Sequence, residues 1–320
     1  MGRNHARVLK ELPNSELVAV ADTNLEAAEA TAHRLGIHAY TNYIDLLEKE
    51  RPGAVVIATP PTLHLSPALA VLQAGAHVLV EKPIAATLLD GEKLIAAAQA
   101  AGKLLMVGHI VRFNPAVQAL KAHLHAGRLG RIFQIACRRV GPFPAPARDI
   151  GVVIDLAPHD LDLMCWLLES EPLSLQSQIA QRVHTDFEDL VVSLLRFPGG
   201  EIGSLEINWL TPTKVREVCV LGERGLMRVD DLTQDLYFYE NARAENWPQS
   251  VGTGWPALQT IKGVAEGTMT RFALQRQEPL KAELAAFLSA IQSGGPAPVS
   301  GEDGLRALRL ALQMLEQVKN

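Results

Sequence analysis

Short apolar runs alternate with helical segments through the first third of the chain, and this alternation constrains the fold more than any other feature. The segments between the runs are partly polar, and several end at a glycine, as helices commonly do. Apolar strands separated by helices are typical of a parallel, doubly wound sheet. The predicted strands are Glu16–Asp22, Ala54–Ala58, Ala76–Val80 and Leu104–Val107, and the predicted helices are Asn24–Leu35, Tyr43–Glu50, Leu63–Ala74 and Leu88–Ala101.

The pattern changes after about residue 114, where strand-like runs and hairpin turns such as Pro198-Gly199-Gly200 predict an antiparallel meander. The predicted strands are Arg131–Val140, Leu175–Gln181, Leu190–Phe197, Glu201–Asn208, Arg216–Leu221, Leu226–Val229 and Leu236–Tyr239. The predicted helices are Pro115–Ala126, Val153–Leu168, Lys281–Gln292 and Leu305–Val318, and Asn241–Phe272 is expected to be irregular. We therefore predict an α/β chain. A Rossmann domain covers residues 1–113, and an α+β domain with a large open antiparallel sheet covers residues 114–320.

The start of the chain matches only part of a dinucleotide-binding fingerprint. Such a fingerprint is a strand, a G-x-G-x-x-G turn, a helix and, roughly 20 residues on, an acidic residue for the adenine ribose. Gly2 matches the last glycine and Asp22 matches the acid, whereas the strand and the other glycines have no counterpart. Without that strand, the predicted strands near Val18 and Val55 would lack a neighbour, so we expect the fingerprint to begin upstream of Met1.

Asp22 bears on the choice of cofactor, because a carboxylate at this position repels a 2′-phosphate. It therefore favours NAD over NADP, and the following Thr23 and Asn24 supply no arginine for a phosphate. The alternative role for Asp22 is that of a helix N-cap.

Composition excludes several classes of function. The net charge is −5 and there is no basic tract, so nucleic acid is not an expected partner. The three cysteines Cys137, Cys165 and Cys219 form no CxxC pair, and neither a disulfide framework nor a metal site is expected. No apolar stretch approaches the roughly 20 residues of a membrane span, and no signal peptide is evident. A cytoplasmic protein without membrane contact is the expectation.

Several motifs occur in a fixed order along the chain. They are Gly2-Arg3-Asn4-His5, Ala21-Asp22, Ala58-Thr59-Pro60-Pro61-Thr62-Leu63-His64, Glu81-Lys82-Pro83, Arg112-Phe113-Asn114-Pro115 and Asp155-Leu156-Ala157-Pro158-His159-Asp160-Leu161-Asp162. Together they resemble the Gfo/Idh/MocA family of nicotinamide-dependent sugar oxidoreductases over essentially the whole chain. Glu-Lys-Pro alone is a weak signal, but its combination with the downstream Asp-x-x-x-His-x-x-Asp is specific.

Within the family, the stretches Gly108–Pro115 and His184–Asp189 are most similar to UDP-N-acetylglucosamine 3-dehydrogenases. The resemblance implies NAD as cofactor, a nucleotide sugar oxidised at its C3 hydroxyl as substrate, and a homodimer or homotetramer formed through the open sheet. Two alternatives remain. One is another sugar or inositol dehydrogenase of the same family, and the other is a catalytically impaired sugar-nucleotide-binding homologue.

Lys82, Asp155 and His159 are the expected catalytic residues. Lys82 lies at the carboxyl end of a predicted parallel strand, the edge at which open α/β sheets bind ligands. Asp155 and His159 are four residues apart, so one helix face presents both, and the carboxylate can orient the imidazole. The resemblance implies that Lys82 or His159 removes the hydroxyl proton and that the Lys82–Pro83 bond is cis. The alternatives are a solvated lysine in a turn and an ion pair on a helix surface.

The remaining site residues follow from their places in the motifs. The residues expected to contact the cofactor are Gly2, Asp22, Thr59, Pro60, His64, Glu81 and Lys82, and those expected to bind substrate are Arg112, Asn114, Asp155 and His159. An ordinary hydrogen-bond network is the alternative for Arg112 and Asn114. Asp162 is expected to be structural, and Asp160 exposed.

Two further groups of polar residues lie in predicted loops. Arg148 and Asp149 could meet a nucleotide-sugar phosphate or hydroxyl, or belong to a plain surface loop. His184, with Asp186, Glu188 and Asp189 nearby, is interpreted as solvated charge rather than as a metal site.

Overall fold

The computed structural model describes residues 1–143, 150–183, 186–242 and 265–317. The chain divides into two compact units, the first formed by residues 1–114, 153–163 and 277–320 and the second by residues 115–152 and 164–276. The break after residue 114 lies beside the boundary predicted from sequence. The predicted boundary did not anticipate that the last two helices, α8 (Pro279–Ser293) and α9 (Gly301–Glu316), group with the first unit. They do so because α8 packs against helix α1 (Gly2–Glu11) and α9 against strand β5 (Leu105–Gly108).

The parallel strands of the first unit form two separate sheets. Strand β1 (Ala19–Ala21) pairs with β2 (His38–Tyr40), and β3 (Ala54–Ile57), β4 (His77–Glu81) and β5 form a sheet in the order β3-β4-β5. All of these pairs are parallel, and β1 and β3 do not pair with each other. The consequence is visible in burial. Val78, Leu79 and Val80 of the central strand are fully buried, whereas Val55 and Val56 of β3 are only partly buried.

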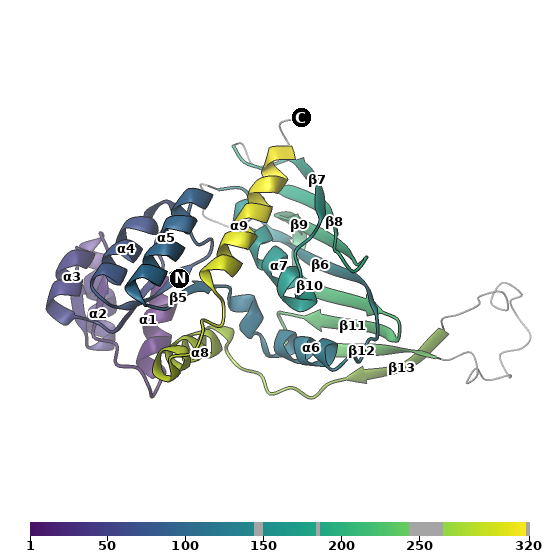
Figure 1. The fold of residues 1–320 in the computed structure, drawn as a ribbon, viewed down its shortest axis with the longest axis horizontal. Helices are drawn as coiled ribbons and strands as arrows, with labels where there is room; N and C mark the ends of the chain where they lie inside the picture. The colour runs from purple at the N-terminus through teal and green to yellow at the C-terminus, as the bar shows by residue number, and fades with distance from the viewer. Residues whose placement is uncertain (144–149, 184–185, 243–264, 318–320) are drawn as a thin grey trace, which may run out of the picture. The chain divides into compact units, whose positions relative to one another are not determined.

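Helices cover these strands (Figure 1). Besides α1, α8 and α9 they are α2 (Leu25–Leu35), α3 (Tyr43–Glu50), α4 (Leu65–Gln73), α5 (Leu88–Ala101) and the 3-10 turns η1 (Pro61–Leu63) and η2 (Ile110–Phe113). Local sequence sets their ends. Asn24 accepts a hydrogen bond from the Ala27 amide and so caps α2, Thr87 caps α5, and α5 stops at Gly102 with a φ of 61°. Because Asn24 is the cap, Asp22 is not needed for that role.

The second unit is built on an eight-stranded sheet in the order β13-β12-β11-β10-β6-β9-β8-β7 (Figure 1). Its strands are β6 (Ile132–Pro142), β7 (Ser174–Ala180), β8 (Leu190–Arg196), β9 (Ile202–Asn208), β10 (Leu210–Gly222), β11 (Gly225–Asp230), β12 (Asp235–Ala242) and β13 (Ala265–Arg271). All neighbours are antiparallel except β6 and β9. Helix α6 (Pro115–His125) packs against β11 and β12, and the division between the units falls within helix α7 (Val152–Leu168).

Two strands escaped the sequence prediction. Strand β2 has only three residues, and β13 lies inside the stretch that was expected to be irregular. Strand β10 is also longer than predicted, because it continues across an irregularity between Leu210 and Val215. Within the described parts of the chain, no helix has the length and apolar character to cross a membrane.

Candidate active site

Lys82 projects from the carboxyl end of β4 onto helix α7. Its Nζ donates a hydrogen bond to the Asp155 carbonyl oxygen at 2.5 Å and approaches the Asp155 carboxylate at 3.3 Å. Both side chains are mostly buried, with exposed fractions of 16% for Lys82 and 9% for Asp155. The Lys82–Pro83 peptide bond is cis, as the motif predicted. The structure thus brings together two of the three expected catalytic residues, which lie 73 positions apart in sequence.

His159 lies on the same helix, one turn after Asp155. It is half-buried, and Asp155, His159 and Asp162 are spaced by four and three residues, so all three share one face of α7. Asp160, which was expected to be exposed, is 1% exposed, so that prediction is wrong. The expectation neglected that nearly every residue of this helix is buried, including the flanks of the motif.

Behind Lys82, a buried carboxylate is held by histidine. Glu81 Oε1 lies 2.6 Å from His5 Nε2, and Glu81 Oε2 accepts the Lys82 backbone amide at 3.2 Å. Burial raises the pKa of Glu81, but the contacts with His5 and Lys82 outweigh it and leave that pKa below its usual value. Gly108 of β5 gives the carboxyl group room, since a Cβ there would meet the Glu81 carboxyl carbon at 3.2 Å.

Glu283 of α8 is a second carboxyl group in this region. It is fully buried, and neither oxygen has a hydrogen-bond partner among the residues that the structure describes. Burial first, and the Glu81 carboxylate second, raise the pKa of Glu283 well above its usual value. Glu81 and Glu283 thus have pKa values shifted in opposite directions. Sequence reasoning missed both Glu283 and His5 as parts of this region. Glu283 lies in a helix where no motif marks it, and His5 belongs to the Gly2-Arg3-Asn4-His5 motif but was assigned no role of its own.

The residues after β3 divide into an exposed and a buried part. Thr59 and Pro60 are exposed, as expected for residues near a cofactor. His64 was expected to contact the cofactor, but its side chain is fully buried and its ring nitrogens face the carbonyl oxygens of Pro83 at 3.0 Å and Thr59 at 2.8 Å. His64 thus connects Thr59 to Pro83, the residue after Lys82, and its contact with the cofactor stays a prediction. Burial lowers the pKa of His64, while its contacts with backbone carbonyl oxygens act to raise it.

Gly2 and Asp22 both lie at exposed ends of secondary structure. Helix α1 begins at Gly2 without a side-chain cap from Met1, and a Cβ at Gly2 would contact Ala58 at 4.0 Å, next to Thr59. Asp22 follows β1 directly and accepts the Asn24 amide with Oδ1 at 2.9 Å. Within the described ranges of the chain, the other carboxylate oxygen of Asp22 has no donor and can accept a hydrogen bond from a ligand.

Arg112 and Asn114 are placed differently from the expectation of substrate contact. The Arg112 side chain is 4% exposed and pairs with Asp162, while Asn114 is 1% exposed as a residue. The Arg112 guanidinium is directed at a buried carboxylate, so its contact with substrate stays a prediction. The contact also fits the structural role expected for Asp162, whereas the second partner of Arg112, Asp303, carries no motif and was missed.

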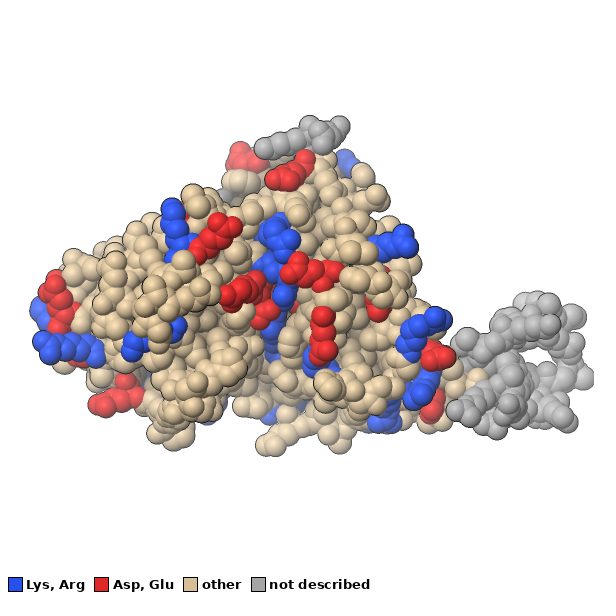
Figure 2. All heavy atoms as spheres, in the orientation of Figure 1, with Lys and Arg blue, Asp and Glu red and all other residues tan. Residues whose placement is uncertain are grey.

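Three other expectations concern metals, charge and the loops. Among the described residues, no group of histidine, cysteine and acidic side chains could hold a metal ion. Arg148, Asp149 and His184 lie outside the described residues. On the face drawn in Figure 2, acidic and basic side chains are interspersed, and no large patch of one sign is visible.

Comparisons with known proteins add to this geometry. Residues 1–109 match the family profile GFO_IDH_MocA, described as an oxidoreductase family with an NAD-binding Rossmann fold, and residues 117–228 match the GFO/IDH/MocA C-terminal domain. UDP-N-acetylglucosamine 3-dehydrogenase of Acidithiobacillus ferrooxidans is 30% identical over 314 residues, which are 98% of this chain and 93% of the relative. The structure of that enzyme solved in crystal form P21 aligns with this chain at a TM-score of 0.84 and 30% identity. The alignment covers 99% of this chain and 93% of that chain.

Two further relatives differ in substrate. Inositol 2-dehydrogenase of Rhizobium meliloti is 29% identical over 325 residues, covering 97% of this chain and 92% of the relative. The WlbA dehydrogenase of Bordetella pertussis was solved in complex with NADH and UDP-GlcNAcA. It has a TM-score of 0.78 at 26% identity and covers 99% of this chain and 93% of that chain.

Proposed function

Because this chain belongs to the Gfo/Idh/MocA family of NAD-dependent oxidoreductases, we propose that it oxidises a sugar ring hydroxyl to a ketone, at C3 of UDP-N-acetylglucosamine. Membership confirms the family, the fold class, the oxidoreductase activity and the NAD cofactor that the motifs predicted. The specific substrate is part of the proposal. It is supported by two relatives that are similar over nearly the whole chain, one named for a UDP sugar and the other solved in complex with one.

The contact between Lys82 and Asp155 is the observation that carries the chemistry. It puts the Lys82 amine and a carboxylate at the carboxyl end of a parallel strand, where open α/β sheets bind their ligands. We assign Lys82 and His159 to the substrate hydroxyl, one of them accepting its proton, and Asp155 to orienting Lys82. When bound, NAD supplies the hydride acceptor, so the carbon loses a hydride, the hydroxyl loses a proton, and the product is a ketone.

Several backbone amides and side chains of this chain are suited to bind parts of the NAD molecule. The first-turn amides of α1 lack a side-chain cap and can bind the pyrophosphate, and the free Asp22 oxygen can accept a ribose hydroxyl. Thr59, Pro60 and Glu81 are assigned to the nicotinamide half of the site because they follow β3 and end β4.

A homodimer or homotetramer formed through the eight-stranded sheet is proposed as well. One face of this sheet presents Val192, Leu194 and Ile202, which are 48%, 56% and 53% exposed. Exposed apolar residues grouped on one surface mark interaction sites. Leu194→Glu is expected to shift the mass measured by light scattering towards the monomer, and an unchanged mass would contradict this interface.

The test of the substrate compares NADH formation with UDP-N-acetylglucosamine, free N-acetylglucosamine and myo-inositol. We expect the UDP sugar to give the highest kcat/KM, since the nucleotide supplies binding energy remote from the reacting carbon. Activity only on myo-inositol would favour the second candidate, an inositol dehydrogenase, which the similarity to the Rhizobium meliloti enzyme supports. Binding of UDP sugars without turnover would indicate the impaired homologue.

A further inference from the structure

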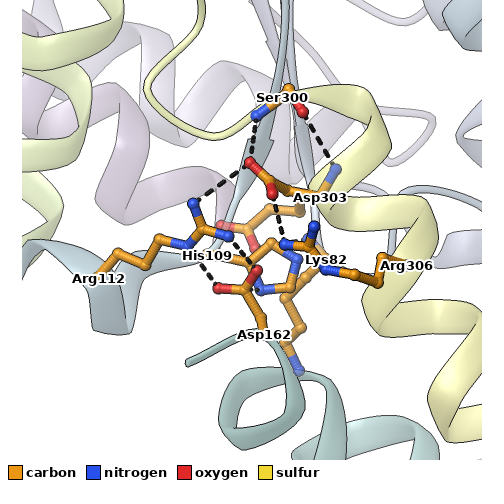
Figure 3. A network of polar contacts seen from close by, with 8 residues as sticks. Lys82, His109, Arg112, Asp162, Ser300, Asp303 and Arg306 are labelled. Atoms are coloured by element: carbon orange, nitrogen blue, oxygen red, sulfur yellow. Dashed lines mark hydrogen bonds and ion pairs between the residues drawn. The ribbon is translucent and has the colours of Figure 1, made fainter. Parts of the chain in front are cut away.

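A cluster of buried and partly buried charges borders the Lys82 site (Figure 3). We define the Arg112 cluster as Arg112 of η2, Asp162 of α7, and Asp303 and Arg306 of α9. Two arginines and two aspartates balance in charge, and they join three elements that are distant in sequence. The cluster is close to the catalytic residues, because His109 Nδ1 lies 3.6 Å from Asp162 Oδ2 and Lys82 lies in the same group of side chains (Figure 3).

Arg112 binds Asp162 through two parallel hydrogen bonds. Nε donates to Oδ2 at 2.7 Å and Nη2 donates to Oδ1 at 2.5 Å, with side-chain exposures of 4% and 1%. This paired geometry fixes orientation as well as distance, which a lysine could not reproduce. Burial acts to lower the pKa of Arg112, but Asp162 and Asp303 raise it above the usual value, so the guanidinium stays charged.

Asp303 connects the amino end of α9 to the Arg112–Asp162 pair. Its Oδ2 lies 3.3 Å from Arg112 Nη1 and accepts the Ser300 amide at 3.1 Å, while Arg306 donates to Oδ1 at 2.5 Å. Ser300 Oγ in turn accepts the Asp303 amide, which completes a capping box. With these contacts the guanidinium is engaged on two sides by carboxylates held in place by their own helices.

The position of Asp162 on α7 connects the cluster to the reaction. Asp155, His159 and Asp162 share one helix face, so fixing Asp162 also fixes the rotation of the helix about its axis. Pro158 lies between Asp155 and Asp162 and cannot donate the backbone hydrogen bond that would stiffen this turn. The helix is thus held on each side of its proline, by Lys82 at Asp155 and by Arg112 at Asp162.

We infer that Arg112 is a positioning residue that, through Asp162, holds Asp155 and His159 of α7 in register with Lys82. The inference rests on the proposed function and gives Arg112 a role in place of substrate binding. Its contacts with Asp162 provide the route, because they connect the Arg112 guanidinium directly to the helix that carries Asp155 and His159.

Steady-state kinetics separate positioning from substrate binding. For Arg112→Lys we expect kcat to fall about tenfold or more, while KM for the sugar and for NAD stays within about twofold of the wild type. The matched control is Arg271→Gln, at an exposed pair with Asp235 of 2.7 Å, for which both constants should be unchanged. An unchanged kcat, or a sugar KM raised about tenfold with kcat retained, would overturn the inference.

A double variant tests the inference even if the Arg112→Lys variant fails to fold. Arg112→Gln with Asp162→Asn removes both charges, so that neither is left buried and unpaired. In this variant hydrogen exchange measured over peptides of α7 should be faster than in the wild type, and in Arg271→Gln it should not. Exchange in α7 that matches the wild type would overturn the inference. This readout needs no substrate. If the wild type oxidises none of the sugars tested, the proposed function fails while the cluster is still tested.

Discussion

Glu283 offers a prediction in which stability and pH are linked. Its carboxyl group is fully buried and lacks a hydrogen-bond partner among the described residues, a situation that costs roughly 1–3 kcal/mol by mutational measures. Replacement by leucine, which is apolar and of similar size, removes this cost. We therefore expect Glu283→Leu to be about 1–3 kcal/mol more stable than the wild type near neutral pH. At roughly 2–4 °C per kcal/mol, the melting temperature should rise by at least about 2 °C.

The sign of the pH dependence follows from the raised pKa. A carboxyl group whose pKa is higher in the folded than in the unfolded state prefers to stay protonated when folded. Glu283 therefore makes its full contribution to the free energy of unfolding at pH values below its ordinary pKa of 4.5. That contribution is lost as the pH rises towards the pKa of Glu283 in the folded state. The advantage of Glu283→Leu should accordingly be larger at about pH 7.5 than at about pH 5.

Urea unfolding followed by circular dichroism at both pH values measures the difference. Glu283→Gln is the matched control, because it cannot ionise but still buries a polar group, so its advantage should be smaller than that of leucine. If both variants are less stable than the wild type by more than about 1 kcal/mol, the reasoning is refuted, because Glu283 must then form a hydrogen bond that stabilises the fold.

Three further predictions concern single side chains. Lys82→Met should lower kcat by about 10²–10⁴-fold with little change in NAD affinity, measured by NADH formation and calorimetry, and a smaller loss would move the base role to His159. Asp22→Ser should raise the ratio of NADP to NAD use by about tenfold in kcat/KM, since it removes the charge that repels a 2′-phosphate, and an unchanged ratio would speak against ribose contact. Phe287→Ala should cost about 3–5 kcal/mol in urea unfolding because its side chain is 1% exposed, and a cost below about 1 kcal/mol would contradict its place in the core.

The sequence was sufficient for the fold class because the apolar runs are long and regular. Strands such as β4 are buried on both faces, and the alternation with helices leaves few other arrangements. It failed for β2, whose three residues His38–Tyr40 include two partly polar side chains and carry no periodic signal. The grouping of α8 and α9 with the first unit also had no local signal, since it depends on packing between distant segments.

In the candidate active site, the motifs identified the polar residues but did not indicate which way their side chains point. Lys82 and Asp155 were predicted together because their motif is specific, and they are in contact. His64 and Arg112 carry equally clear motifs, yet both face the interior and bind groups of the chain itself. Sequence spacing cannot distinguish a polar residue that binds a ligand from one that holds a ligand-binding residue, because both must be polar and fixed in place.

The Arg112 cluster also bears on the order in which the protein acquires its activity. Lys82 and Asp155 are separated by 73 positions, but Arg112 and Asp303 are separated by 191, and closing a longer loop costs more chain entropy. Most of the parallel sheet lies before residue 109, so it is complete on the ribosome long before α9 is synthesised. The Arg112 cluster is therefore complete only when α9 docks and Asp303 reaches the Arg112 guanidinium. A refolding chain should regain its helical signal before its turnover, with the enzyme inactive in between although most of its secondary structure is formed.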